Sequence, residues 1–255
     1  MWYIINALLL RELKTRFGQN PKLGYIWVVL EPSILICLIA YLYVYVIERS
    51  ISQMPFIFVL IAGIVPYFMF RKIIINMMNG IDSNRTLFTY RPVKPIHVLI
   101  SRAILEAILH FILLFVLMFL SSKLFQHYWI PYNILEVLFI FVWFAIFSFS
   151  IGLIFTALFY NNDAVKNVIT YTLIMFYIGS AVVVPLWFIP EKYINYLAYN
   201  PILQILELLK QNYFIEYPKI RQINYTYPIV CTTLTLFFGL YLYNKNKIKL
   251  STVSE

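Results

Sequence analysis

The chain has 255 residues, of which 62% are hydrophobic and 12% are charged, and its formal net charge is +9. A soluble domain carries about 25% charged residues, so this composition excludes an ordinary soluble protein, whose surface would be left uncovered. The Lys and Arg residues lie in the breaks between apolar runs rather than in one basic domain, which excludes a nucleic-acid-binding protein.

Residues 1–24 are predicted to form an amphipathic helix and a turn at the membrane surface. Glu12 and Arg16 are a favourable i,i+4 pair, and the basic side chains of this segment can contact anionic lipid. The opposite arc of the helix is apolar and holds Leu9, Leu10, Leu13 and Phe17. An ordinary juxtamembrane anchor explains this pattern as well as a specialised interface helix does.

Six later stretches are apolar over a length that spans a bilayer core of about 30 Å. We therefore expect an all-α integral membrane protein with a single transmembrane domain of six helices. Most of the 20 Lys and Arg residues fall on one side of the membrane if the N-terminus is cytoplasmic, and the positive-inside rule then places both chain ends in the cytoplasm. The domain covers residues 25–244, the cytoplasmic tail covers 245–255, and the six spans are 25–47, 50–70, 96–122, 137–162, 167–190 and 222–244.

A connection over residues 73–95 is too long to be a simple cytoplasmic turn. Asn84 can cap a short helix, which Pro92 and Pro95 would end. Basic and aromatic residues alternate in it, a mixture that is favoured at interfaces with a soluble partner. These residues are Arg85, Phe88, Tyr90, Arg91 and Lys94. The positive-inside rule alone also explains the basic residues.

A second long connection, residues 191–221, is predicted to be external. Asn200-Pro201 divides it, and the later piece repeats apolar residues at helical spacing, with Glu207 and Lys210 off the apolar face. Two re-entrant half-helices fit this pattern, because apolar runs of this length are more often interfacial or re-entrant than spanning. A helical hairpin lying on the surface is the alternative.

Sequence motifs for catalysis or nucleotide binding are absent from the chain. It contains no G-x-x-x-x-G-K-[ST] motif, no zinc-ligand spacing and no G-x-S-x-G elbow. Ionisable residues at membrane depth are candidates for function, and here they are Glu31, Glu106, His110 and Glu136. Glu106 can pair with His110 or with Arg102, each four residues away, so both a functional and a purely helix-stabilising role stay open.

Aromatic residues are abundant, with 21 Tyr, 22 Phe and 5 Trp. Some are expected to form the belts that anchor any membrane protein at its two interfaces. Others, such as Trp143 and Tyr171, lie in the middle of predicted spans. Aromatic faces can stack on sugar rings, so a path rich in them would suit a sliding glycan, whereas packing against lipid is the alternative for any one residue.

Several segments follow one another in an order that resembles a known family over nearly the whole chain. They are RELKTRFGQNPKLGYIWVVLEP (11–32), AGIVPYFMFRKI (62–73), SNRTLFTYRPVKP (83–95), SRAILE (101–106) and YNPILQILELLKQNYF (199–214). Together they resemble the ABC-2-type membrane subunits that export polysaccharides, and most of all the permeases of capsular polysaccharide exporters.

The resemblance implies the ABC-2 (type V exporter) fold and a permease that moves lipid-linked capsular polysaccharide from the cytoplasm across the inner membrane. The expected partners are a second copy of the chain, a dimer of ABC ATPase subunits, membrane lipids, and periplasmic and outer-membrane export proteins. ATP and Mg would be bound by the ATPase subunit, so this chain is expected to be no enzyme and to need no cofactor, metal or nucleic acid.

The resemblance also implies roles for particular residues. Coupling to the ATPase is expected at Glu12, Asn84, Arg85, Arg91 and Lys94. Contact with the substrate is expected at Arg11, Lys14, Arg16, Trp27, Glu31, Tyr67, Trp143 and Tyr171. Two other functions stay open: an ABC-2 permease for O-antigen, teichoic acid or another amphipathic cargo, and a membrane-embedded enzyme of glycolipid synthesis.

Overall fold

The computed structural model describes residues 2–17, 21–46, 55–89 and 92–251, and every regular element among them is helical. The first three helices are α1 (Trp2–Phe17), α2 (Pro21–Val46) and α3 (Phe56–Met78). The later elements are η1 (Asp82–Thr89), α4 (Pro95–Phe125), α5 (Ile134–Phe159), α6 (Asp163–Gly179), η2 (Leu186–Phe188), α7 (Glu191–Leu197), α8 (Pro201–Tyr213) and α9 (Thr226–Ser251). The all-helical prediction is confirmed for this part of the chain.

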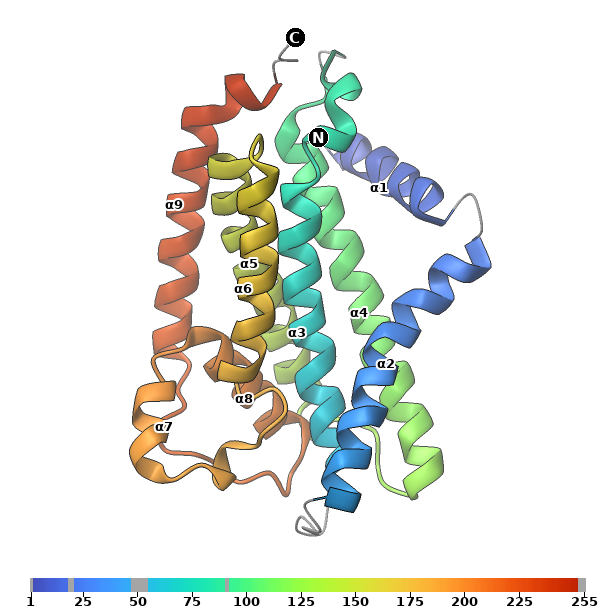
Figure 1. The fold of residues 1–255 in the computed structure, drawn as a ribbon, viewed down its shortest axis with the longest axis vertical. Helices are drawn as coiled ribbons and strands as arrows, with labels where there is room; N and C mark the ends of the chain where they lie inside the picture. The colour runs from blue at the N-terminus through green and yellow to red at the C-terminus, as the bar shows by residue number, and fades with distance from the viewer. Residues whose placement is uncertain (1, 18–20, 47–54, 90–91, 252–255) are drawn as a thin grey trace.

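The long helices form a bundle with two different ends (Figure 1). One end, at the top of Figure 1, carries α1, which lies across the bundle, together with η1 and the last turns of α9; we call it the near end. The opposite end, at the bottom of Figure 1, carries α7, η2 and the connection between α4 and α5; we call it the far end. Elements that are distant in the sequence therefore meet at each end, and both candidate regions described below arise in this way.

Four helices within the described residues are long and apolar enough to cross a membrane: α3, α4, α5 and α9. The helix α2 has 26 residues, and the part of it whose side chains the structure describes is the apolar stretch Val29–Leu42. The helix α6 has 17 residues and ends at Gly179, whereas the sequence predicted an apolar span as far as residue 190. The chain breaks there because Ala181 adopts a left-handed conformation with a φ of 50° and Pro185 follows.

The central helix of the bundle is α3, which packs against α2, α4, α5, α6 and α8. Its residues 58–70 are all buried, and this stretch is apolar on every side, as a helical segment surrounded by other helices should be. Gly63 allows a close approach here, since a Cβ at this position would lie 2.5 Å from the Val182 carbonyl oxygen. The segment that follows α6 is thereby held directly against the core.

The connection between α6 and α9 contains two short helices at the far end, α7 and α8. Asn200 separates them, and its side-chain oxygen caps α8 by accepting a hydrogen bond from the Ile202 amide at 3.0 Å. Residues 202–210 of α8 are buried without interruption. The alternative of a hairpin lying on the surface is therefore wrong for α8, which packs among α3, α5 and α9.

Candidate functional site

A polar junction joins α1 to the rest of the near end, and Asn84 of η1 lies at its centre. The Asn84 side chain, only 2% exposed, accepts a hydrogen bond from Arg11 Nη1 at 2.8 Å. Its amide nitrogen donates to Glu12 Oε1 at 3.2 Å and to the Gly80 carbonyl at 3.0 Å. One buried amide thus binds two neighbouring charged residues of α1, Arg11 and Glu12, and buried amides need such partners to offset their lost hydration.

Arg102 of α4 completes this junction, which we call the α1 junction (Arg11, Glu12, Asn84 and Arg102). Its Nε donates to Glu12 Oε1 at 3.0 Å and its Nη1 donates to the Asn76 carbonyl at 2.8 Å. Its Nη2 also reaches Ser83 Oγ at 2.7 Å. Charge-assisted bonds of this kind are the strong ones, so the guanidinium fastens α1, the end of α3 and the start of η1 to α4.

A polar cavity of about 320 Å³ opens beside the α1 junction. Glu106 lies at its wall and accepts a hydrogen bond from Asn76 Nδ2 at 2.6 Å. On its other side Glu106 Oε2 lies 3.5 Å from His110 Nδ1. The predicted Glu106–His110 contact is present, whereas Arg102 pairs with Glu12 instead of Glu106. The described residues that line it are Arg11, Glu12, Thr15, Asn76, Ser83, Asn84, Arg102, Leu105 and Glu106.

The other side of η1 is bound to the beginning of α6. Lys166 Nζ donates to Asp82 Oδ2 at 2.5 Å and to Asp163 Oδ1 at 3.0 Å. Arg85 Nη2 bridges Asp82 Oδ1 and Asn161 Oδ1, each at 2.8 Å. The short η1 element is therefore held on one side by α1 and α4 and on the other by α6.

Glu31 of α2 joins this helix to α3. Its carboxylate lies 3.0 Å from Arg71 Nη2 and 2.7 Å from Lys72 Nζ. The Arg71 guanidinium also lies 5.0 Å from the centre of the Phe68 ring. The structure thus gives this carboxylate two cationic partners, where the sequence placed it among the residues that contact substrate.

Two of the predicted substrate-contacting aromatic residues are buried between helices. The Tyr67 hydroxyl donates to the Leu173 carbonyl of α6, and Trp143 Nε1 donates to Thr232 Oγ1 of α9 at 2.9 Å. Neither side chain reaches a surface along which a cargo could slide. Tyr171 of α6, by contrast, is 69% exposed and remains available for such a contact.

The remaining predicted residues lie near the first and last turns of helices or outside the described part. Lys14 is exposed beside Arg11, with which it lines a shallow cavity on α1. Lys94 is the residue at the N-terminal cap of α4, where its amide donates to His97 Nδ1 at 3.2 Å. The side chains of Arg16 and Trp27, and all of Arg91, lie outside the described residues.

Sequence reasoning missed a fully buried ion pair in α8. Glu207 Oε1 and Lys210 Nζ are 2.8 Å apart with both side chains 0% exposed, so these residues are buried although they lie off the apolar face of α8. Lys210 also donates to the Ala181 carbonyl, and Glu207 Oε2 accepts from the Tyr217 hydroxyl, each at 2.8 Å. Burial and the neighbouring Glu207 carboxylate raise the pKa of Tyr217 well above its ordinary value. The sequence signal that could have revealed this pair is an acidic and a basic residue three positions apart within an apolar helix.

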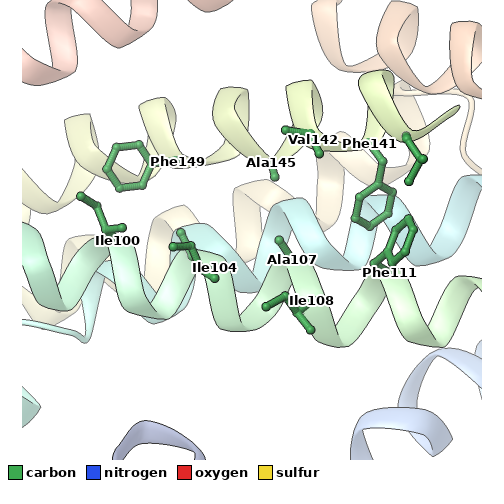
Figure 2. Close-up of a pocket in the computed structure, with 11 residues that line it drawn as sticks. Ile100, Ile104, Ala107, Ile108, Phe111, Phe141, Val142, Ala145 and Phe149 are labelled. Atoms are coloured by element: carbon green, nitrogen blue, oxygen red, sulfur yellow. The ribbon is translucent and has the colours of Figure 1, made fainter. Parts of the chain in front are cut away.

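An apolar groove of about 470 Å³ runs between α4 and α5 (Figure 2). The figure shows the alanines Ala107 and Ala145 between larger side chains, and these small residues leave the space open. The described residues of the lining offer no polar side chain, so the groove suits an alkyl chain rather than a polar ligand. Its lining is Ile100, Ala103, Ile104, Ala107, Ile108, Phe111, Leu138, Phe141, Val142, Ala145 and Phe149.

A model of the ABC-2 type transporter family matches residues 3–214. The chain belongs to this family. It is also 32% identical over 239 residues to the polysialic acid transport protein KpsM of Escherichia coli, covering 94% of this chain and 92% of that protein. The capsule polysaccharide export inner-membrane protein CtrC of Neisseria meningitidis serogroup B is 25% identical over 248 residues, with 95% and 90% of the two chains covered.

A third relative, the capsule polysaccharide export inner-membrane protein BexB of Haemophilus influenzae, is 26% identical over 157 residues, which cover 61% of this chain and 58% of that protein. The resemblance predicted from the sequence is thus confirmed at the level of the family and its capsule-export relatives. With its apolar helices, the chain is a multi-pass protein of the inner membrane.

Proposed function

We propose that this chain is the membrane permease subunit of an ATP-driven exporter that moves lipid-linked capsular polysaccharide from the cytoplasm across the inner membrane. The observation that carries the proposal is the similarity to KpsM over 94% of the chain. Since the sequence has no P-loop motif, the energy must come from a separate ATPase subunit, and two copies of each subunit would form the exporter. Periplasmic and outer-membrane proteins would receive the cargo.

The proposed membrane arrangement uses α2 and α6 as spans in addition to the four long apolar helices. The basic near end then faces the cytoplasm, with residues 1–24 as the interface segment and 245–255 as the tail of a transmembrane domain over 25–244. The helix α9 continues as far as Ser251, so the lysines that the sequence assigns to the tail lie on the last turns of this helix. At the periplasmic far end, α7 and α8 would re-enter the bundle, and the burial of α8 supports this.

Coupling to the ATPase is proposed to pass through η1. The segment 73–95 would contact the ATPase with Arg85, Arg91 and Lys94. Because η1 is bonded to α1 through Asn84, to α4 through Ser83 and to α6 through Asp82, any displacement of η1 must move these helices or break the bonds. Nucleotide-driven motion would reach the membrane domain by this route.

Substrate contact is proposed to begin on the polar arc of α1. Arg11, Lys14 and Arg16 would hold the anionic headgroup of the lipid-linked cargo through charge-assisted hydrogen bonds. The exposed Tyr171 would contact the glycan, while Trp27, Glu31, Tyr67 and Trp143 are proposed to shape the path. For the last three, the bonds to α3, α6 and α9 support an action through helix packing.

The test is deletion of the gene followed by complementation with the wild-type chain. We expect the deletion strain to accumulate polysaccharide in the cytoplasm, seen by fractionation and electron microscopy, and the wild-type chain to restore it to the surface. A strain whose partner ATPase carries an inactivated P-loop lysine is the matched control and should behave like the deletion. Normal surface polysaccharide in the deletion strain would contradict the proposal, as would loss of polysaccharide from every compartment.

A further inference from the structure

A small pocket at the far end combines tyrosines with a carboxylate, and neither the sequence predictions nor the near-end coupling route uses it. It has a volume of about 250 Å³ and lies between the α4–α5 connection and the segment that follows α8. We call it the outer pocket; it is lined by His127, Tyr128, Ile130, Tyr132, Tyr213, Phe214, Ile215 and Glu216.

The walls of the outer pocket are fastened to each other by hydrogen bonds between backbone groups. The Tyr132 amide donates to the Tyr213 carbonyl at 3.0 Å, and the Asn133 amide donates to the Asn212 carbonyl at 3.1 Å. The Tyr213 hydroxyl then reaches the Trp129 carbonyl at 2.6 Å. Two segments some 80 residues apart in sequence are thus fixed in one arrangement, and a preformed site loses less entropy when a ligand binds.

The floor and the rim of the pocket have different character. Tyr213 and Phe214 are buried with their ring centres 4.8 Å apart, and form the apolar floor. Tyr128 and Tyr132 at the rim are 87% and 62% exposed. Within the described part of the chain, neither rim hydroxyl nor the Glu216 carboxylate has a hydrogen-bond partner. A ligand in the outer pocket would therefore meet tyrosine ring faces together with hydroxyl and carboxylate groups that are free to form hydrogen bonds.

From this combination we propose that the outer pocket binds a neutral or amino sugar unit of the exported polysaccharide, an inference that rests on the proposed function. Tyrosine rings can stack on the C–H face of a pyranose, while hydroxyl and carboxylate groups bond to its hydroxyls. Among the residues that the structure describes, the lining contains Glu216 and no Lys or Arg, so phosphate, sulfate and carboxylate groups are disfavoured there. The same absence argues against the headgroup of an anionic lipid.

The test measures binding of short oligosaccharides cut from the cell's own surface polysaccharide, using the full chain with its ATPase in lipid nanodiscs. Saturation-transfer NMR should detect binding to the wild type, and the double change Tyr128→Ala, Tyr132→Ala should lower the affinity about tenfold. The Phe double variant should lose less because the rings remain. Tyr196→Ala is the matched control, since Tyr196 is 70% exposed at the same end but lies outside the pocket.

Charge selection is tested by Glu216→Gln with a carboxylated and a neutral oligosaccharide of equal length. We expect the variant to raise the affinity for the carboxylated probe several-fold relative to the neutral one. Unchanged binding in the Ala double variant, or an equal loss in the Tyr196 control, would overturn the inference. A wild-type chain that restores export but binds no oligosaccharide would also overturn the inference. This holds even if the Ala double variant loses export, because that loss would then reflect a broken contact with a periplasmic protein. Failure of the wild type to restore export would instead overturn the proposed function.

Discussion

At the scale of single residues, Asn84 attaches α1 to η1, because one amide bonds two charged side chains of α1. Its oxygen accepts from Arg11 and its nitrogen donates to Glu12. Replacement by alanine leaves Arg11 and Glu12 without this partner at the α1 junction, where all three side chains are at least partly buried. Removing one partner of a buried polar group costs about 1–3 kcal/mol, so a single substitution here should loosen the attachment of α1.

The first prediction compares Asn84→Ala with Asn84→Asp. The Ala variant should lower the free energy of unfolding by about 1–3 kcal/mol, and the Asp variant should be worse because it places a second carboxylate beside Glu12. Thermal unfolding in detergent measures both. Thr89→Ala is the control, because the Thr89 hydroxyl bonds within η1, to the Thr86 carbonyl. An Asp variant as stable as the wild type would contradict the hydrogen-bond assignment.

The buried pair Glu207–Lys210 yields a second prediction, on the coupling of two substitutions. Lys210→Met should destabilise the chain by about 3–5 kcal/mol because it leaves a carboxylate buried without its cation. Adding Glu207→Gln should recover most of that loss, since the amide is neutral and still accepts from the Tyr217 hydroxyl. Thermal unfolding of the two single variants and the double variant gives the coupling energy. Additive losses would show that the two side chains act independently.

At the scale of elements, the sequence located the helices well because apolar run length and helical period are local properties. It predicted α2 to α5 and α9 from their apolar runs, and the short break at Asn200. It did not predict that α6 ends at Gly179, because valines and leucines continue beyond it and the bend depends on Gly63 admitting the Val182 carbonyl to the core.

Polar partners were harder to predict than helices, for a physical reason. Helical spacing fixes which side chains share a face, but not which other element covers that face. Glu12 therefore has Arg102 of α4 as an observed partner, a residue 90 positions away, in addition to any local one. Likewise Glu207 and Lys210 lie off the apolar stripe of α8 yet are buried, because helices cover α8 on more than one side.

The third prediction concerns η1 as the element that links the ATPase contact to α6. Asp82→Asn removes one carboxylate from both Lys166 and Arg85. We expect the variant to insert normally and to keep the ATPase active, while polysaccharide export falls by about fivefold or more, in the range of a typical coupling free energy. ATP hydrolysis in nanodiscs and surface polysaccharide in cells are measured together.

The matched change for this prediction is Asp163→Asn. Asp163 also pairs with Lys166, but its side chain is 89% exposed, whereas that of Asp82 is 37% exposed. Exposed ion pairs contribute about 0–1 kcal/mol, so this variant should export nearly as well as the wild type. Equal loss of export and of ATP hydrolysis in the Asp82 variant would show a folding defect rather than lost coupling.

At the scale of the whole molecule, the bundle is polar at both ends for different reasons. The near end gathers ion pairs that bind α1, η1 and α6 to one another. The far end instead carries the aromatic outer pocket and the buried pair of α8. This asymmetry matches a transporter that receives energy at one end and releases its cargo at the other. The match requires that the near end faces the cytoplasm.

The last prediction tests that orientation directly. Both cysteines of the chain, Cys37 and Cys231, are free, so they can be replaced by alanine and single cysteines introduced at Tyr196 of the far end and Lys247 of the near end. Both positions are exposed. In right-side-out membrane vesicles a membrane-impermeant maleimide should label Tyr196→Cys and leave Lys247→Cys unlabelled, because basic residues are retained on the cytoplasmic side.

Inverted vesicles serve as the control, since there the same reagent should label Lys247→Cys and spare Tyr196→Cys. Export activity of both variants shows that the chain has inserted in its working orientation. The opposite pattern in the two vesicle types would place η1 and the α1 junction in the periplasm, where no ATP is present to drive an ATPase bound to them. Both the coupling route through η1 and the sugar site in the outer pocket would then have to be abandoned together.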